Sequence, residues 1–92
     1  MIRSFRHKGI QTYFLKGSKA GIQPKHAARL RLQLGALDRA KGRNDMNASG
    51  WRLHALAGSL KGQWAVWVDD SWRLTFSCED GNAMLVNYED FR

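Results

Sequence analysis

Two arginines and a histidine fall at alternate positions of two stretches that have the pattern of β-strands. Residues 72–78 alternate apolar with polar side chains, so the apolar ones share one face and Arg73 lies on the other. Residues 51–56 alternate in the same way and place Arg52 and His54 together. If both strands turn their apolar faces to one core, these three side chains gather on the open face of the sheet. Such a face is suited to binding an anion.

A phosphodiester is an anion that these residue types could process without a metal. Cleavage of RNA in this way needs a base for the 2′-hydroxyl, a cation for the phosphate oxygens and an acid for the departing 5′ oxygen. Arg73 would supply the cation, because a guanidinium is permanently charged and can make two parallel hydrogen bonds to phosphate. His54 could act as base or acid, because histidine titrates near neutral pH. Asp90, near the end of the chain, could act as a base or orient a neighbour.

Each of these residues also has a plainer structural explanation. A histidine on a strand is often an ordinary surface residue, an outward arginine often pairs with a carboxylate, and Asp90 could serve only solubility. The tryptophans are open to similar alternatives. Trp51, Trp64 and Trp72 occupy apolar positions and are expected in the core. Trp67, on the opposite face from Trp64, could stack on a base or on a partner protein.

Residue types that bind metals or nucleotides are not suitably spaced. The single cysteine, Cys78, excludes an internal disulfide, and with His7, His26 and His54 it lacks the paired spacing of a zinc site. Its position on the apolar face of a strand predicts a buried core residue. There is no glycine-rich phosphate loop after a strand and no nucleophile motif. We therefore predict neither a metal nor a cofactor.

The length of 92 residues predicts a single domain, 1–92, with an uneven distribution of charge. Residues 1–50 contain eleven Lys and Arg against two acidic residues, a net charge of +9, whereas residues 51–92 contain four against six, a net charge of −2. This favours a polyanionic partner such as RNA, DNA or an acidic protein segment, although a merely soluble basic face explains the charge equally well. We expect a cytoplasmic protein without a membrane partner, because no secretory signal or apolar run of about 18 residues is present.

Helices in the basic half and strands in the other half would position these residues. Residues 2–5 permit a first strand. Apolar spacing predicts helices over 7–16, ended by Gly17, and over 24–41, begun by Pro24 and ended by Gly42. Alternation predicts four strands, at 51–56, 64–68, 72–78 and 83–89. The order β-α-α-β-β-β-β is that of an α+β domain with two N-terminal helices on one face of an antiparallel sheet and an open second face.

Several dispersed motifs resemble those of the HigB toxins of the RelE/ParE superfamily. They are residues 1–9, 45–47, 52–54, 72–76 and 87–90, together with Leu56 and Gly58. The resemblance implies a RelE-like fold with a twisted sheet. It also implies a ribosome-dependent mRNA endonuclease that inhibits translation by cutting mRNA in the ribosomal decoding site. A toxin of this kind belongs to a type II toxin–antitoxin system and is inhibited by a HigA-type helix-turn-helix antitoxin.

The resemblance also implies roles for individual residues. His54, Arg73 and Asp90 match positions of the family's concave active surface, with the arginine on the scissile phosphate. The residues that we expect to contact RNA are Arg52, Lys61, Trp67, Arg73, Phe91 and Arg92. The basic helical half would contact ribosomal RNA.

The chain departs from the family pattern at three positions. Similar members have a lysine at the position of Ala57 and end in Tyr-His, where this chain ends in Phe91 and Arg92. These changes remove a phosphate-binding lysine, a stacking hydroxyl and a proton-transfer group, although Lys61 could reach the phosphate instead. Loss of a proton-transfer group typically lowers the rate by roughly 10² to 10⁴-fold.

Three functions therefore remain open. The chain could be a divergent toxin that still cleaves, or a catalytically impaired HigB-like protein that binds its antitoxin, the ribosome or both without cutting. It could also be an unrelated basic RNA-binding module, which would need exposed stacking aromatics on adjacent strands. Trp67 is the one fair candidate for such an aromatic residue.

Overall fold

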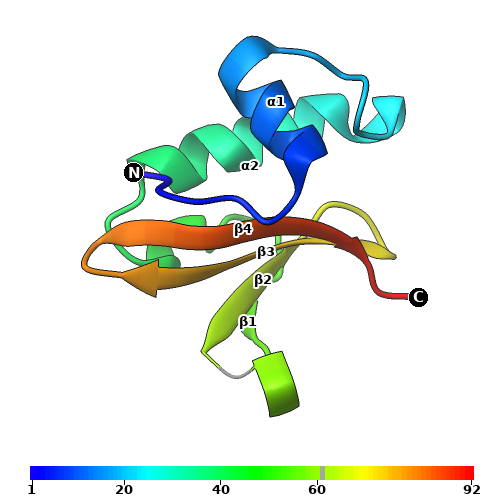
Figure 1. The fold of residues 1–92 in the computed structure, drawn as a ribbon. Helices are drawn as coiled ribbons and strands as arrows, with labels where there is room; N and C mark the ends of the chain where they lie inside the picture. The colour runs from blue at the N-terminus through cyan, green and yellow to red at the C-terminus, as the bar shows by residue number, and fades with distance from the viewer. Residues whose placement is uncertain (61) are drawn as a thin grey trace.

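Two helices lie on one side of a four-stranded antiparallel sheet in the computed structural model, which describes residues 1–60 and 62–92 (Figure 1). The helices are α1 (Lys8–Lys16) and α2 (Ala27–Arg39), and the strands are β1 (His54–Ala55), β2 (Gln63–Trp67), β3 (Trp72–Glu79) and β4 (Asn82–Asp90). Three short 3-10 turns, η1 (Pro24–His26), η2 (Arg43–Met46) and η3 (Gly58–Leu60), complete the elements. The strands are ordered β1-β2-β3-β4, as in the chain. This confirms the predicted α+β class with two N-terminal helices.

Both helices begin and end close to the predicted positions. The side chain of His7 accepts a hydrogen bond from the amide of Ile10 and caps the start of α1, and Gly17 ends it with a left-handed φ of 77°. Pro24 opens the η1 turn that leads into α2. The helix α2 ends at Arg39, because the next residue is extended. In the described ranges, no helix is both long enough and apolar enough to cross a membrane.

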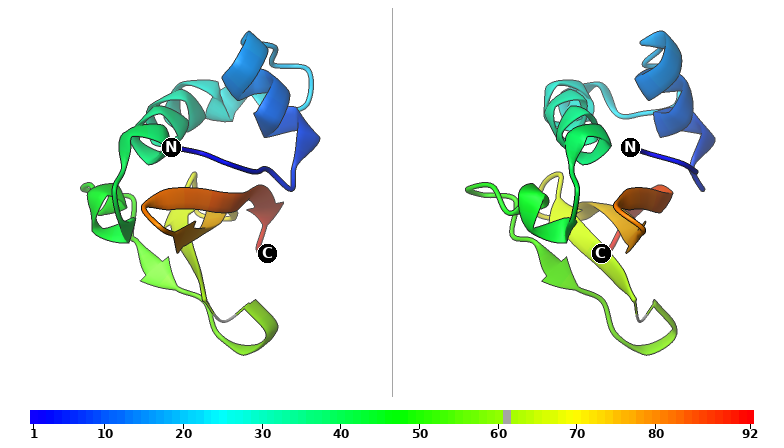
Figure 2. Two further views of the ribbon diagram at one scale, coloured as in Figure 1. Left: turned by 60° about the vertical axis from the view of Figure 1, so that its left-hand side comes forward. Right: turned by 90° about the vertical axis from the view of Figure 1, so that its left-hand side faces the viewer.

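The core lies between α2 and the sheet. The apolar stripe predicted for α2 is buried at Leu30, Leu34 and Leu37. It packs with α1, β2, β3 and β4 in one cluster, which includes Ile10, Val66, Leu74, Phe76, Val86 and Tyr88. Burying a leucine side chain stabilises the fold by about 1.5–3 kcal/mol, so this stripe holds α2 against one face of the sheet. The short β1 strand and η3 lie away from the helices (Figures 1 and 2).

The predicted first strand over residues 2–5 is wrong. This segment runs between the helices and β4 (Figure 2) and makes only two isolated parallel bridges, Ile2 to Ala83 and Phe5 to Val86. Between these bridges Leu85 has a left-handed φ of 55°, and its amide donates to the side-chain oxygen of Ser4. A bulge in β4 at Leu85 prevents a continuous ladder between β4 and residues 2–5. The alternation of residues 2–5 predicted a strand because it carries no information about a bulge in the partner strand.

Two further predictions about the sheet need correction. The strand predicted over 51–56 is reduced to His54–Ala55, because Arg52 has a left-handed φ of 52° that interrupts extended backbone. Cys78 is exposed and not a core residue. The extra residue of the register shift between Thr75 and Ser77 lies in β4, so Cys78 keeps the face of Phe76; it is exposed because it lies near the end of β3, where the strand is no longer buried.

Candidate functional site

A row of three side chains crosses the sheet at the start of β3. Trp67 of β2 pairs with Arg73, and Arg73 pairs in turn with Glu89 of β4. Cross-strand partners share a face, so these side chains lie on the same face. The guanidinium carbons of Arg73 and Arg52 each lie 4.1 Å from the centre of the Trp67 ring, within cation–π distance. The structure therefore brings Arg52, Trp67 and Arg73 together on the predicted face.

The guanidinium of Arg73 is held by backbone carbonyls of the turn between β2 and β3. Its Nη1 donates to the carbonyls of Asp69, at 2.8 Å, and Trp72, at 3.1 Å, and Nη2 donates to the carbonyl of Asp70, at 3.3 Å. Carbonyls carry no net charge, so these bonds orient the cation without neutralising it. Three of the five N–H donors of an arginine are used in this way within the described residues, and two remain for an anionic ligand.

His54 lies on the same face, one row along the sheet. It pairs with Ala65 of β2, which pairs with Thr75 of β3. The Nδ1 atom of His54 lies 2.8 Å from the carbonyl oxygen of Arg52. A carbonyl only accepts, so in the neutral ring Nδ1 carries the hydrogen and Nε2 is the free acceptor. Ala65 and Thr75 are themselves buried, so the face is open at its ends and not across its whole width as predicted.

Asp90 is not brought together with Arg73. It pairs with Trp72, one residue before Arg73, so it lies on the opposite face of the sheet. Its carboxylate binds Arg92, whose Nε lies 2.7 Å from Asp90 Oδ2. The Arg92 guanidinium holds the pKa of Asp90 below its ordinary value. The carboxylate that the sheet places opposite Arg73 is Glu89, which the sequence interpretation missed although its alternation with Tyr88 contained the information.

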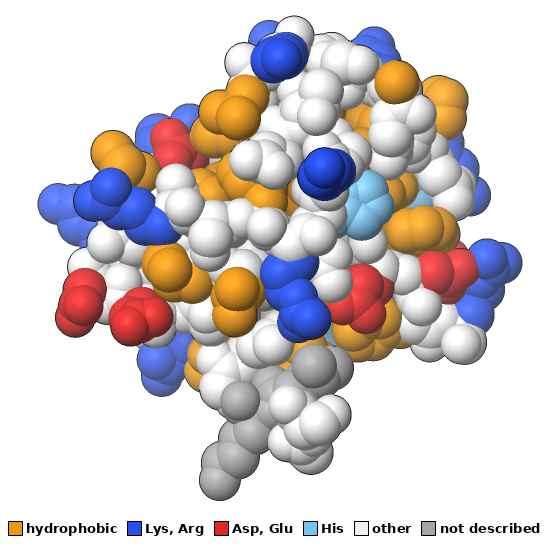
Figure 3. All heavy atoms as spheres, viewed as in Figure 1, with side chains coloured by type: hydrophobic (Ala, Val, Ile, Leu, Met, Phe, Trp, Pro, Cys, Tyr) orange, Lys and Arg blue, Asp and Glu red, His pale blue; other side chains and the backbone are white. Residues whose placement is uncertain are grey.

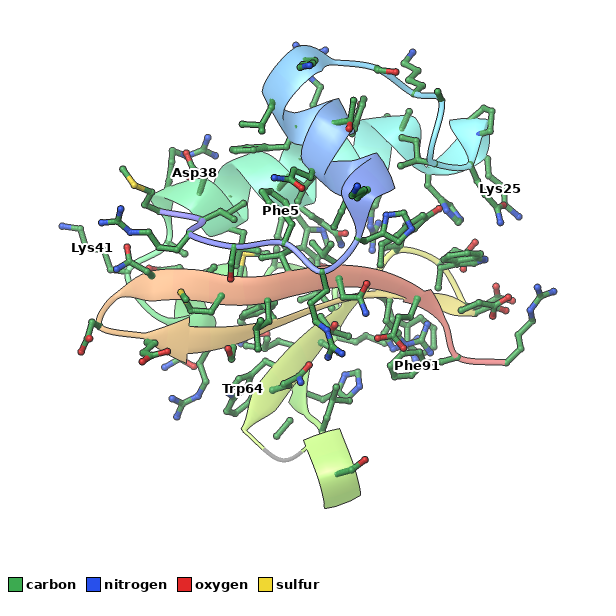
Figure 4. All side chains as sticks on the ribbon, viewed as in Figure 1. Phe5, Lys25, Asp38, Lys41, Trp64 and Phe91 are labelled. Carbon is green, nitrogen blue, oxygen red and sulfur yellow. The ribbon has the colours of Figure 1, made fainter. Side chains whose placement is uncertain are left out.

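The remaining predicted RNA contacts lie at the edges of this face or outside the described residues. Lys61 lies outside them, so its predicted role stays a prediction. Ala57 follows β1 and is exposed. Phe91 is exposed at the C-terminal end, and its amide donates to the carbonyl of Ser71 at 2.8 Å. Figure 4 shows Phe91 at the same end of the molecule as Lys25.

A second cluster of titratable groups lies beneath this end of the sheet, and no sequence pattern indicated it. His26 is buried, with Nε2 2.6 Å from Asp69 Oδ2 and Nδ1 2.5 Å from the Tyr88 hydroxyl. Burial opposes ionisation of Asp69, but hydrogen bonds from the Trp72 amide, His26 and the Ser71 amide outweigh it and hold the Asp69 pKa well below its usual range. Burial raises the pKa of Tyr88. Within residues 1–60 and 62–92, no group of three His, Cys, Asp or Glu could hold a metal ion.

The charges are divided between the layers of the fold. Figure 3 shows Lys and Arg side chains over the helices in the upper half, whereas most of the acidic side chains on this view lie lower, over the sheet. Five of the eleven basic residues of the first 50 positions lie in α1 and α2 and form a cationic helical layer: Lys8, Lys16, Arg29, Arg31 and Arg39. Such a layer favours association with a polyanion.

Comparisons with known proteins agree on the class of this chain. Residues 3–92 match the family described as the RelE-like toxin of type II toxin–antitoxin system HigB. Endoribonuclease HigB of Proteus vulgaris is 37% identical over 91 residues, which cover 99% of each chain. The fold resembles the crystal structure of YafQ from E. coli strain BL21(DE3), with a TM-score of 0.56, 13% identity, and coverage of 98% of this chain and 93% of that one. A point mutant of E. coli YafQ gives a TM-score of 0.55 with 15% identity and the same coverage.

Proposed function

The chain belongs to the HigB-like family of RelE-like toxins in type II toxin–antitoxin systems, and we propose that it is a ribosome-dependent endoribonuclease that inhibits translation. In this proposal it cleaves mRNA in the decoding site without a metal. The observation that carries the proposal is the arrangement of Arg52 and Arg73 on the ring of Trp67. Two cations and one aromatic ring on a partly exposed face of a sheet match the phosphates and the base of a single-stranded nucleotide.

Each residue of this face has a distinct role in the proposed reaction. Arg73 binds the scissile phosphate with the two N–H donors that its turn leaves free, and stabilises the charge that develops on the oxygens. His54 accepts the 2′-hydroxyl proton at Nε2. Arg52, the exposed one of the two arginines, moves from the Trp67 ring to a neighbouring phosphate, and a base stacks on the ring in its place. Phe91 contributes a second apolar surface beside the RNA.

The C-terminal residues explain why we expect slow cleavage. Arg92 cannot donate a proton to the departing 5′ oxygen, because a guanidinium stays protonated. Water must then supply that proton. We assign Asp90 to holding Arg92 at the end of β4, where the arginine adds a cation for RNA. A missing general acid lowers the rate by roughly 10² to 10⁴-fold without abolishing it.

The proposed partners follow from family and charge. An antitoxin is implied by the type II toxin–antitoxin family, and we propose that it is of the HigA helix-turn-helix type. The cationic helical layer contacts ribosomal RNA in this proposal, while the face with Arg73 receives the message. Both events take place in the cytoplasm.

Cleavage of mRNA on programmed ribosomes in the presence of a chelator tests the proposal. The native chain should cut, and Arg73→Ala should lower the cleavage rate by roughly 10²-fold or more, because one fixed donor group to a developing charge has that value. Arg73→Lys is the matched control: it keeps the charge but loses the forked geometry, and should give an intermediate rate. An Arg73→Ala variant that cuts as fast as the native chain would overturn the proposal.

A second candidate function is favoured by the bonds between Arg92 and Asp90. They occupy the carboxylate that the family resemblance assigns to the active surface. The chain would then be an impaired toxin that binds its antitoxin and the ribosome without cutting. The variant Ala57→Lys, Phe91→Tyr, Arg92→His distinguishes the two. If the triple variant cuts and the native chain only binds, the impaired form is the correct description.

A further inference from the structure

We propose that the buried pair of His26 and Asp69 positions the Arg73 guanidinium through the turn between β2 and β3. His26 and Asp69 are thus positioning residues: they do not touch the substrate but act through Arg73. The importance of this for cleavage rests on the proposed function. The contacts themselves form one continuous path from the helical layer to the opposite face of the sheet.

The first part of the path fixes the imidazole of His26 at both nitrogens. Nε2 lies 2.6 Å from Asp69 Oδ2, and a carboxylate only accepts, so Nε2 carries a hydrogen. In the neutral ring Nδ1 then accepts the hydroxyl hydrogen of Tyr88. His26 is 2% exposed and Tyr88 is 3% exposed, and the Trp72 ring packs against both. The imidazole therefore has one orientation available.

The second part of the path is the carboxylate of Asp69, both of whose oxygens are used. Oδ2 accepts from His26, and Oδ1 accepts the amides of Ser71, at 2.9 Å, and Trp72, at 2.7 Å. Bonds of an aspartate to the amides two and three residues ahead define the conformation of a turn. Because His26 of η1 binds Oδ2, the carboxylate connects the turn to η1 as well as to the amides of the turn itself.

The third part of the path joins this turn to Arg73. The carbonyls of Asp69 and Asp70 are two of the three acceptors that hold the guanidinium. Their directions depend on the same backbone that the Asp69 carboxylate shapes. If the carboxylate loses His26 and rotates, the two carbonyls turn and the guanidinium loses its place over Trp67. A misplacement of about 1 Å at a reacting centre can lower a rate by roughly 10²-fold.

Simple ion pairing of Asp69 does not explain the arrangement. Lys25 lies 3.9 Å from Asp69 Oδ2, but its side chain is 69% exposed. An exposed pair of this kind contributes little and fixes no geometry. The buried imidazole donates along one direction, as positioning requires.

Positioning differs in its consequences from a role in stability alone. If His26 and Asp69 only stabilised the fold, the orientation of Arg73 would be unchanged in any variant that still folds.

Nuclear magnetic resonance of the Arg73 side chain tests the positioning without any ribosome. Three hydrogen bonds hinder rotation of the guanidinium, so native Arg73 should give separate Nη signals, identified by their loss in Arg73→Lys. His26→Leu removes the donor and should merge or broaden these signals. His26→Gln keeps an N–H donor near the position of Nε2 and should restore them. Unchanged Arg73 signals in a folded His26→Leu chain would overturn the inference.

Two further variants make this measurement decisive. Asp38→Ala is the matched control, because Asp38, like Asp69, accepts a hydrogen bond from a backbone amide, that of Ile2. Asp38 lies near the end of α2, on the opposite side of the molecule from Lys25 (Figure 4). It should leave the Arg73 signals unchanged. If His26→Leu does not fold, Tyr88→Phe takes its place, because it removes only the hydroxyl that holds Nδ1. Arg73 signals that also stay unchanged in Tyr88→Phe would then overturn the inference.

Cleavage on programmed ribosomes provides the second readout. His26→Leu should lower kcat by roughly 10 to 100-fold with little change in KM, and His26→Gln should recover most of it. In an Arg73→Lys background, His26→Leu should lower kcat little further. If the two reductions in kcat multiply fully in the double variant, His26 does not act through Arg73.

The two readouts also separate the proposed function from the positioning. A native chain that never cuts refutes the proposed function, and the magnetic resonance result then decides the positioning. If the native chain cuts, and both kcat and the Arg73 signals are unchanged in His26→Leu, only the positioning is refuted.

Discussion

Trp67 and Arg73 stand directly opposite each other on neighbouring strands, and the guanidinium carbon of Arg73 lies 4.1 Å from the centre of the Trp67 ring. The pair unites an aromatic ring with a permanent cation at the half-buried start of β3. A nucleotide could engage both groups at once, with its phosphate on the Arg73 guanidinium and its base on the ring in place of Arg52. Binding and cleavage should therefore respond differently to changes at the two residues.

Replacing Trp67 with alanine should weaken binding of single-stranded RNA. Stacking of one base on an aromatic side chain contributes about 1–3 kcal/mol, and the Arg52 and Arg73 guanidinium groups also lose their support. Affinity for a short non-cleavable RNA, measured at fixed salt, checks this. Trp67→Phe retains a ring and should bind nearly as well as the native chain. Equal affinities for Trp67→Ala and the native chain would exclude stacking at this position.

Replacing Gly9 with alanine should destabilise the fold. A methyl group on Gly9 would overlap the backbone carbonyl of Gly21, where α1 and the following loop approach closely. Relieving such an overlap requires backbone movement and costs about 1–3 kcal/mol. The free energy of unfolding in urea provides the measurement. Gly42→Ala is the control, because its added methyl meets no atom within 4 Å and its φ of −164° is ordinary extended backbone.

The stability that Asp69 contributes should depend on pH in a defined direction. His26 and Lys25 face its carboxylate, and its pKa in the folded chain is depressed below the ordinary value of 3.8. The contribution is therefore fully present above about pH 4 and is lost as the pH falls through the lower folded value. Asp69→Asn should cost more stability at about pH 6 than at about pH 3. A difference in unfolding free energy that is the same at both pH values would show that Asp69 ionisation is not involved.

Burial imposes a period on the sequence, and this made the helices, three of the strands and the shared face of Trp67 and Arg73 predictable. A helix packed on a sheet must bury every third or fourth residue, as α2 does with Leu30 and Leu34. A half-buried strand must alternate, and this placed Trp67 and Arg73 on the correct face. In such cases a local pattern and the tertiary structure carry the same information.

Features that depend on pairing between distant segments were not predictable in this way. The bulge at Leu85 in β4 leaves the N-terminal segment with isolated bridges and no strand, and Cys78 is exposed because it lies near the end of β3, where the strand is no longer buried. The bond between His26 and Asp69 joins residues 43 positions apart and leaves no periodic trace. The position of Asp90 on the face opposite Arg73 was not predictable either, because it depends on a register that the terminal residues alone do not define.

Removing Arg92 should raise the pKa of Asp90 towards its ordinary value. The hydrogen bond from the Arg92 side chain is the main reason why this pKa is low, whereas the charge of Asp69 acts in the opposite direction. Titration of the Asp90 carboxyl carbon by nuclear magnetic resonance in native, Arg92→Lys and Arg92→Ala chains measures the effect, and the lysine variant should fall between the other two. Because Asp90 lies on the face opposite Arg73 and Arg92 donates no proton in the proposed reaction, Arg92→Ala should leave kcat near that of the native chain and weaken mainly the binding of RNA. If the Asp90 pKa is the same in all three chains, the pairing with Arg92 does not control this carboxylate.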